Sequence, residues 1–250
     1  MDLNEYRGTE AEKQRVADLI GLLPDRIASA LDVGARDGFI SRRLAERVSA
    51  VTALDLETPS IDHERIRCVK GNVTALDFPD DSFDIVLCAE VIEHISPRLL
   101  AKACGELGRV SREFLILGVP YKQDIRMSRS TCQECGGKNP PWGHVNRFDE
   151  RRLRELFPGF KMAKISFVGE AGPGTNALSS LLMDWAGNPY GTYSQEEPCI
   201  HCGARLKEPP QRNLWEKILT KAAVAARDFQ RAFMKPHPNW IHVLFKKGPR

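Results

Sequence analysis

Two pairs of cysteines in this sequence have the spacing of metal ligands. Cys132 and Cys135 form one C-x-x-C pair, Cys199 and Cys202 form the other, and a glycine follows each pair. The glycine permits the tight turn that directs two sulfurs at one ion, and two such turns would make a structural zinc site with four cysteine ligands. The pairs are separated by 63 residues, so the fold must bring them together. A redox role for each pair is the alternative.

A second group of side chains, Glu90, Glu93 and His94, is spaced at i, i+3 and i+4. If a helix begins near Glu90, the three side chains share one face. Two carboxylates and an imidazole could hold a divalent ion such as Mg²⁺ or Mn²⁺, with His144 as a further ligand. Without a metal, His94 or Glu93 could act as the general base. A third interpretation makes the glutamates a helix cap and His94 a pocket wall.

A glycine-containing turn is predicted at residues 31–38, where the sequence is LDVGARDG. It contains Asp32 and Gly34, follows a predicted strand and opens a predicted helix. Glycine lets the backbone turn tightly and approach a ligand closely. Asp55 ends the next predicted strand, 23 residues after Asp32, and a carboxylate there can accept both hydroxyls of a ribose. Together they indicate a site for a dinucleotide or for S-adenosylmethionine.

The elements that must position these residues alternate along the chain. Short apolar runs predict strands, and apolar residues at helical spacing predict helices. The predicted strands span residues 28–33, 51–54, 66–69, 83–88, 114–119, 160–168 and 240–245, and the predicted helices span 9–23, 39–48, 99–110, 149–157 and 213–235. This alternation is typical of an α/β fold with a doubly wound, mostly parallel sheet. In such sheets the ligand lies beyond the carboxyl ends of the strands.

The order of motifs after the glycine turn resembles a known family. The run Gly71-Asn72-Val73 follows the third predicted strand, FPDDSFD at 78–84 leads into the fourth, and Glu90 to His94 come next. This series resembles the class I S-adenosylmethionine-dependent methyltransferases, closely over residues 25–120 and more loosely up to residue 160. The resemblance implies a seven-stranded Rossmann-like sheet and favours S-adenosylmethionine over a dinucleotide as cofactor.

The resemblance also implies roles for individual residues around the cofactor. The expected cofactor-binding residues are Asp32 and Gly34 beside its methionine part, Asp55 at the ribose, Leu56 and Asn72 at the adenine, Cys88 and Ala89 at the sulfonium, and Ala35, Arg36, Gly38 and Val73 around them. Arg36 departs from the family pattern, which usually has glycine there. Its side chain must point away from the cofactor or contact the carboxylate of the cofactor.

The Glu-x-x-Glu-His pattern is similar to the metal-binding motif of two methyltransferase families. These are the small-RNA 2′-O-methyltransferases and the ubiquinone-pathway O-methyltransferases. By that likeness, a divalent ion would lower the pKa of an acceptor hydroxyl and hold it near the sulfonium.

The regular alternation breaks after residue 120. Residues 121–147 and 170–212 are rich in glycine and proline, and each segment contains one C-x-x-C pair. We expect these zinc-knuckle insertions to form one zinc unit beside the acceptor pocket. Residues 1–120 are expected to be the cofactor-binding half of the methyltransferase domain, and residues 148–169 and 213–250 its C-terminal part.

The last predicted helix, 213–235, is amphipathic and basic. Its apolar stripe includes Trp215, Phe229 and Phe233, and lysines and arginines lie toward the other side. We expect the stripe to pack against the core of the domain. The alternative is that the helix lies on an anionic membrane or covers the substrate site.

Composition and charge exclude several classes of protein. The 250 residues are 42% hydrophobic and 28% charged, which excludes a mainly disordered or fibrous chain. No apolar run reaches the roughly 18 residues that span a bilayer. The start of the chain, residues 1–5, lacks the character of a secretory signal, so we expect a cytoplasmic protein whose seven cysteines form no disulfides. The net charge is +3, but residues 203–250 carry +8, which suggests an anionic partner.

The leading hypothesis is transfer of the methyl group of S-adenosylmethionine to a hydroxyl oxygen. The acceptor would be a small molecule or glycan-like, and could be phosphorylated or lipid-linked. The protein would position the acceptor and remove its proton. RNA 2′-O-methylation is the alternative, although the sequence shows no clustered aromatic residues that would stack bases. A cofactor-free zinc scaffold is a further alternative, against which Asp32, Gly34 and Asp55 argue.

Overall fold

The computed structural model describes residues 7–231 and 233–249, and its contacts divide the chain into two compact units. The first unit comprises residues up to 121, 148–169 and from 238 onward, and the second comprises 122–147 and 170–237. Residues 1–5, on which the expectation of no secretory signal depends, lie outside the described part. The two expected insertions both belong to the second unit. Residues 213–237 belong there too, whereas we expected them in the C-terminal part of the first unit.

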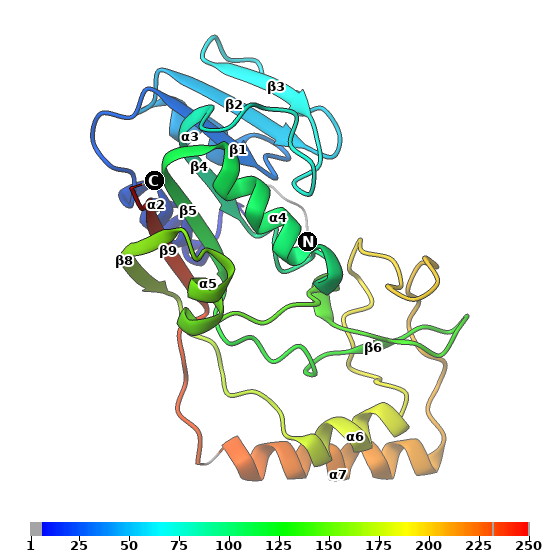
Figure 1. The fold of residues 1–250 in the computed structure, drawn as a ribbon. Coiled ribbons are helices and arrows are strands. Elements are labelled where there is room, and N and C mark those ends of the chain that lie inside the picture. The colour runs from blue at the N-terminus through cyan, green and yellow to red at the C-terminus, as the bar shows by residue number, and fades with distance from the viewer. Residues whose placement is uncertain (1–6, 232, 250) are drawn as a thin grey trace. The chain divides into compact units, whose positions relative to one another are not determined.

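A seven-stranded sheet forms the centre of the first unit (Figure 1). In spatial order its strands are β3 (Ile66–Lys70), β2 (Ala50–Asp55), β1 (Ser29–Val33), β4 (Phe83–Ala89), β5 (Ser111–Pro120), β9 (Trp240–Lys247) and β8 (Phe160–Val168). The first five strands run parallel to one another. Strand β9 runs antiparallel to both β5 and β8. The predicted mostly parallel sheet is confirmed, and each predicted strand overlaps an observed one.

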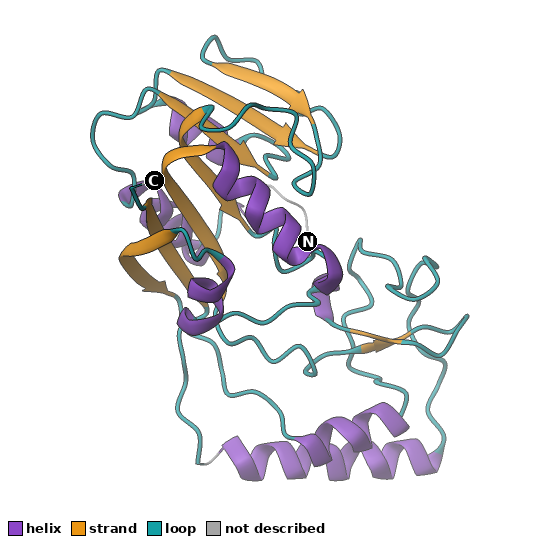
Figure 2. Cartoon of the chain, in the orientation of Figure 1, coloured by secondary structure: helices purple, strands orange, loops and turns teal. Residues whose placement is uncertain are grey.

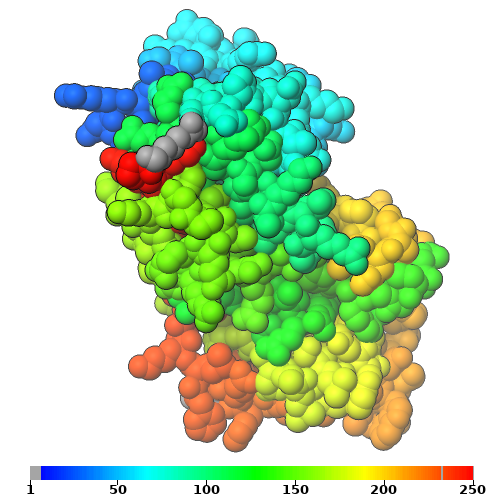
Figure 3. All heavy atoms as spheres, viewed as in Figure 1, coloured from blue at the N-terminus to red at the C-terminus, as the bar shows by residue number. Residues whose placement is uncertain are grey.

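Helices cover both faces of this sheet, because alternate residues of a buried strand point to opposite sides. The helices of the first unit are α2 (Glu10–Gly21), α3 (Phe39–Ala45), α4 (Pro97–Val110) and α5 (Glu150–Leu156). Leu31 of β1 belongs to the apolar core that includes Leu107 of α4, whereas Ala30 belongs to the core that includes Leu44 of α3. Side chains fill the spaces between the ribbons (Figure 3).

The second unit contains little regular structure apart from two helices (Figure 2). Its elements are β6 (Ser130–Thr131), β7 (Lys138–Asn139), the 3₁₀ turn Pro141–Gly143, α6 (Ala177–Trp185) and α7 (Leu214–Arg231). Asn213 caps α7, since its Oδ1 accepts from the backbone N–H of Glu216 at 2.9 Å. The sequence analysis predicted α7 but not α6. Within the described part of the chain, no helix is long and apolar enough to cross a membrane.

A buried carboxylate connects β1 to α3. Asp32 is 2% exposed, and its Oδ2 accepts a hydrogen bond of 2.6 Å from the Ser41 hydroxyl. Burial disfavours the charged form and raises the pKa of Asp32 from 3.8 to about 6, although the Ser41 bond opposes this shift. The folded state therefore holds this proton more tightly than the unfolded chain. The stability that results is fully present below about pH 3.8 and is lost as pH rises through about 6.

We expect Asp32→Asn to remove this pH dependence. Relative to the wild type, the variant should gain about 3 kcal/mol of unfolding free energy between pH 4 and pH 7, the equivalent of roughly two pKa units. Chemical denaturation at several pH values measures the difference. Asp62→Asn, which neutralises an exposed acid of the same unit, controls for the loss of a negative charge. Parallel pH profiles for Asp32→Asn and the wild type would contradict the assignment.

Candidate active site and metal centre

The turn after β1 is attached to β2 by backbone hydrogen bonds. The N–H groups of Gly34 and Ala35 both donate to the carbonyl of Leu54, at 2.8 and 3.1 Å. Gly34 has a φ of 81°, and Gly38 at the start of α3 has 77°. A Cβ at Gly34 would clash with the side chain of Val91, so both the backbone conformation and the close packing require glycine there. The turn is therefore held beside the carboxyl end of β2.

Asp55 lies at that end of β2, and backbone groups fix its carboxylate. Oδ2 accepts from the N–H of Arg36 at 2.9 Å, and Oδ1 accepts from the N–H of Leu56 at 2.7 Å. Each oxygen retains a second lone pair for a ligand hydroxyl. The next side chain, Leu56, is 65% exposed and offers an apolar surface to a planar base. Arg36 adopts a φ of 44°, a backbone that glycine adopts easily, and its side chain is exposed.

The other predicted cofactor residues lie at neighbouring strand ends. Cys88 is fully buried at the end of β4, and Ala89 follows it at 7% exposure. Burial raises the pKa of Cys88 well above its usual value, so its thiol is neutral. Cys88 behaves as a small apolar side chain at the end of the strand. Asn72 is exposed, and its Oδ1 accepts from the N–H and hydroxyl of Thr74. The side chain of Val73 is buried in the apolar core that also contains Leu31 of β1.

The expected helix at Glu90 does not form in the described structure. Residues 90–96 make turns, and α4 begins only at Pro97. Glu90 has a φ of 56° and donates its N–H to the carbonyl of Gly118 on β5 at 2.9 Å. The prediction that Glu90, Glu93 and His94 share a helical face is therefore wrong, because Glu90 makes a turn directly after the end of β4 and its N–H is bound to β5.

The two glutamates nevertheless interact, with Glu93 fully buried and Glu90 half-buried. Burial raises the pKa of Glu90 to about 7. Burial, and then the charge of Glu90, raise the pKa of Glu93 well above its usual range. A carboxylate oxygen of Glu93 lies within 4.8 Å of a ring nitrogen of His94, which is exposed. His144 lies in the second unit, where its Nδ1 is 2.6 Å from Oε1 of Gln123. Its place beside the glutamates remains a prediction.

Two residues near Glu90 were missed by the sequence analysis. The indole of Trp240 on β9 donates to Oε2 of Glu90 at 3.3 Å. Arg15 of α2 is 3% exposed, forms a 2.7 Å ion pair with Glu12, and lowers the pKa of Glu90 against the effect of burial. The signal for Arg15 was a Glu-x-x-Arg spacing on the first helix. Trp240 is 150 residues from Glu90, and no local pattern connects them.

The four cysteines of the two C-x-x-C pairs come together in the second unit. Their sulfurs all lie within 4.8 Å of one another. The Sγ atoms of Cys132 and Cys202 are 3.7 Å apart, and so are those of Cys135 and Cys199. These contacts connect one pair to the other, across 70 and 64 residues of chain. His201 is not one of this set, and its Nε2 lies 3.1 Å from the carbonyl of Lys138.

The two cysteine turns have the same backbone geometry. Gly136 donates to the carbonyl of Cys132 at 2.9 Å, and Gly203 donates to that of Cys199 at 2.8 Å. The two glycines have φ values of 71° and 74°. Burial raises the pKa of Cys199, but nearby backbone N–H groups outweigh it and lower the pKa to about 6. These N–H groups stabilise a thiolate, which is the form that binds metal.

Known proteins are similar to parts of this chain. A family profile described as a methyltransferase domain matches residues 31–113. The ubiquinone biosynthesis O-methyltransferase of Idiomarina loihiensis is 33% identical over 87 residues, covering 30% of this chain and 36% of that protein. An uncharacterized methyltransferase of Mycobacterium tuberculosis is 30% identical over 84 residues, covering 31% of this chain and 43% of that protein. The chain thus spans less than half the length of these curated relatives.

Solved structures share the fold over most of the chain. The YcgJ protein of Bacillus subtilis superposes with a TM-score of 0.57 at 15% identity, covering 95% of this chain and 100% of that one. The N-methyltransferase NodS of Bradyrhizobium japonicum, solved with S-adenosyl-L-homocysteine, gives 0.57 at 12% identity, with 98% and 91% covered. Likeness at this identity shows the fold alone. The family profile and the curated relatives show that residues 31–113 and their surroundings are similar to methyltransferases, and the solved structures show that the chain shares their Rossmann-like fold.

Proposed function

We propose that the protein transfers the methyl group of S-adenosylmethionine to a hydroxyl oxygen of a small-molecule acceptor. The observation that carries the proposal is the carboxylate of Asp55, fixed beside the Gly34 turn in a methyltransferase domain. O-methylation is supported by relatives that are named ubiquinone biosynthesis O-methyltransferases. The uneven charge of the chain also fits an acceptor that is phosphorylated or lipid-linked.

The residues around the turn fit this cofactor, which supplies an activated methyl group on a sulfonium. Asp55 would accept the two ribose hydroxyls with the lone pairs that its backbone bonds leave. The exposed side chain of Leu56 would pack on the adenine, and the amide of Asn72 would reach the edge of that base. Cys88 and Ala89 would leave room for the methyl group, because both are small.

Methylation of a hydroxyl requires the removal of its proton, and we assign this step to His94. Its ring is exposed, so an acceptor can reach it. Glu93 is buried within 4.8 Å of the ring and would orient it. Burial, and then the charge of Glu90, raise the pKa of Glu93. A divalent ion, Mg²⁺ or Mn²⁺, bound by Glu93 and His94 is the alternative within the same site.

We further propose that the four cysteines hold a structural zinc ion. Four sulfurs at about 2.3 Å from a tetrahedral zinc lie about 3.8 Å apart, and two of the sulfur pairs here are 3.7 Å apart. Among the described residues of the second unit, the buried apolar side chains are Cys132, Ala186, Cys199, Leu206 and Ala223. So small an apolar core can order few loops by itself. A structural zinc ion can contribute on the order of 10 kcal/mol to the folding of the segments that bind it.

Removing the charge of Asp55 should weaken cofactor binding. Asp55→Asn loses a charge-assisted contact to two hydroxyls, which is worth roughly 1.5–3 kcal/mol, or about a tenfold to hundredfold increase in Kd. Isothermal titration with S-adenosylmethionine measures the change. Asp62→Asn removes an exposed acid from the same unit and should bind as the wild type does. An unchanged Kd for Asp55→Asn would refute the placement of the ribose.

Replacing His94 should slow methyl transfer without weakening cofactor binding. Removal of a general base lowers kcat by about a hundredfold to ten-thousandfold, whereas Glu93→Gln should cost less, because it only orients the base. The acceptor is found first by screening hydroxyl compounds with labelled cofactor. His63→Ala is the control, since that histidine lies between β2 and β3. Loss of activity in EDTA, restored by Mg²⁺ while zinc content stays constant, would instead support the metal.

The zinc proposal predicts about one zinc per chain by elemental analysis. Cys132→Ser or Cys202→Ser should lower the zinc content and the thermal stability of the second unit together. Cys68→Ser alters a cysteine of the sheet unit and should leave the zinc content unchanged. Protein that lacks zinc, titrates four reactive thiols in this unit and keeps its full stability would disprove the site.

A further inference from the structure

Helices α6 and α7 of the second unit lie side by side (Figure 2), and they meet through small and polar residues. The hydroxyl of Ser179 on α6 donates to the carbonyl of Ala223 on α7 at 2.7 Å. The side-chain amide of Asn176 donates to the carbonyl of Ala226 at 2.9 Å. Ser179, Ala223 and Thr220 are buried. The inner face of the helix pair is therefore made of short side chains and hydrogen bonds.

The large apolar side chains of both helices are exposed instead. We call them the outward stripe: Leu178, Leu181 and Trp185 of α6, Leu214, Trp215, Ile218 and Phe229 of α7, and Phe233 beyond it, each between 45% and 77% exposed. In α7 they recur at helical spacing along one side. This is the reverse of a helix that covers a soluble core, whose apolar face points inward. The prediction that the apolar stripe of α7 packs on a core is therefore wrong.

Large exposed apolar patches mark surfaces that bind another protein, a ligand or a membrane. The second unit has few large apolar side chains inside, since Leu206 is the largest buried one among its described residues. Most of its aromatic residues are exposed, and three of these are tryptophans, of which Trp185 and Trp215 belong to the outward stripe. Tryptophan has an apolar ring and a polar N–H, so it favours the boundary between water and lipid.

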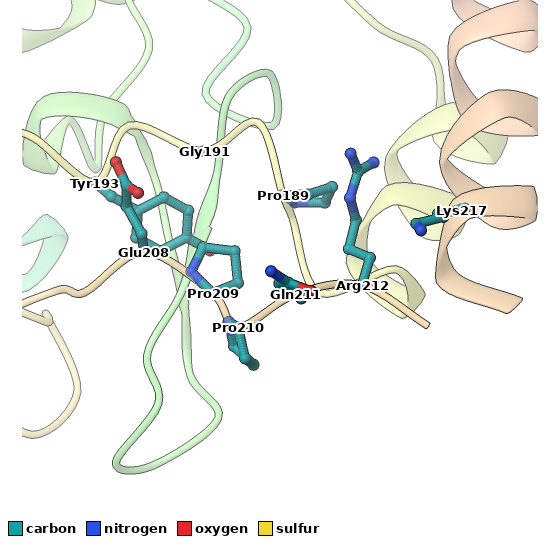
Figure 4. Close-up of a pocket in the computed structure, with 9 residues that line it drawn as sticks. All are labelled: Pro189, Gly191, Tyr193, Glu208, Pro209, Pro210, Gln211, Arg212 and Lys217. Carbon is teal, nitrogen blue, oxygen red and sulfur yellow. The ribbon is translucent and has the colours of Figure 1, made fainter. Parts of the chain in front are cut away.

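Cationic side chains border the outward stripe. Lys217 and Lys221 lie on α7, one turn apart and both exposed. Residues 204–237 contain eight lysines and arginines against three acidic residues. Arg212 and Lys217 also line a cavity of about 420 Å³, where they lie at the end nearest α7, and Glu208 lies at the far end (Figure 4). This surface therefore combines apolar anchors with positive charge.

We propose that the outward stripe docks on an anionic membrane surface. Helix α7 would lie in the plane of the interface, with Trp215, Ile218 and Phe229 inserted among the acyl chains. Lys217, Lys221 and Arg212 would pair with lipid phosphates. Both the apolar area and the charge then contribute to binding. The proposal is independent of methyl transfer, because docking is measured without cofactor or acceptor, and either result can stand without the other.

Co-sedimentation of the zinc-loaded full chain with phosphatidylcholine–phosphatidylglycerol vesicles tests the proposal. The protein should bind these vesicles at low salt, bind less as salt rises, and bind phosphatidylcholine alone weakly. Trp215→Ser with Phe229→Ser should lower the partition coefficient at least about tenfold. Leu99→Ser with Ile165→Ser removes comparable exposed side chains from the first unit and should leave binding unchanged.

A charge variant keeps the test decisive if the aromatic variant unfolds. Lys217→Glu with Lys221→Glu should lower binding about tenfold or more, while Lys161→Glu with Lys164→Glu, the same charge change on β8, should have little effect. Thermal unfolding and zinc content verify that each variant is folded. No binding at low salt, or equal binding by all variants, would overturn the proposal. A dimer by light scattering that Trp215→Ser dissociates would assign the stripe to a second copy and overturn it too.

Discussion

The strand order of the first unit reverses between β1 and β4, because the chain adds β2 and β3 on one side of β1 and then returns to the other. In sheets of this topology the ligand lies at such a reversal, beyond the carboxyl ends of the two strands. Gly34 and Asp55 come together there, because the carbonyl of Leu54 accepts the N–H of Gly34. The candidate cofactor site, Cys88 and the turn at Glu90 all lie at the carboxyl ends of the strands around this reversal.

Desolvated carboxylates are costly, and the first unit has three of them, on β1 and just after β4. Burial raises the pKa of Asp32, Glu90 and Glu93, so their charged forms destabilise the fold at neutral pH. A sequence under selection for stability alone would replace them with apolar residues. Their retention where a cofactor and an acceptor would meet supports a role in chemistry. Arg15 is also buried, and its charge favours the ionised form of Glu90.

The second unit is organised differently, because its buried side chains are few and small while most of its aromatic ones are exposed. Cys132 and Cys199 are buried with Leu206 in a small cluster, and Cys135 and Cys202 are exposed beside them. Helix α7 packs on α6 through Ser179 and Ala223 rather than through leucines. Its small core is the common ground of the two proposals made for this unit, a zinc ion for its loops and a membrane surface for its helices.

The sequence by itself determined the sheet and the cysteine pairing pattern, because strand periodicity and C-x-x-C spacing are local signals. The glycine turn and Asp55 were likewise predicted from strand ends. Only the tertiary structure decided that Glu90 makes a turn after β4 instead of opening a helix, since its N–H is accepted by the carbonyl of Gly118 on a neighbouring strand. It also decided which side of α7 is exposed. An amphipathic pattern shows that a helix has two faces, but the face that is buried depends on the partner, and here the partner α6 presents Ser179 and Asn176.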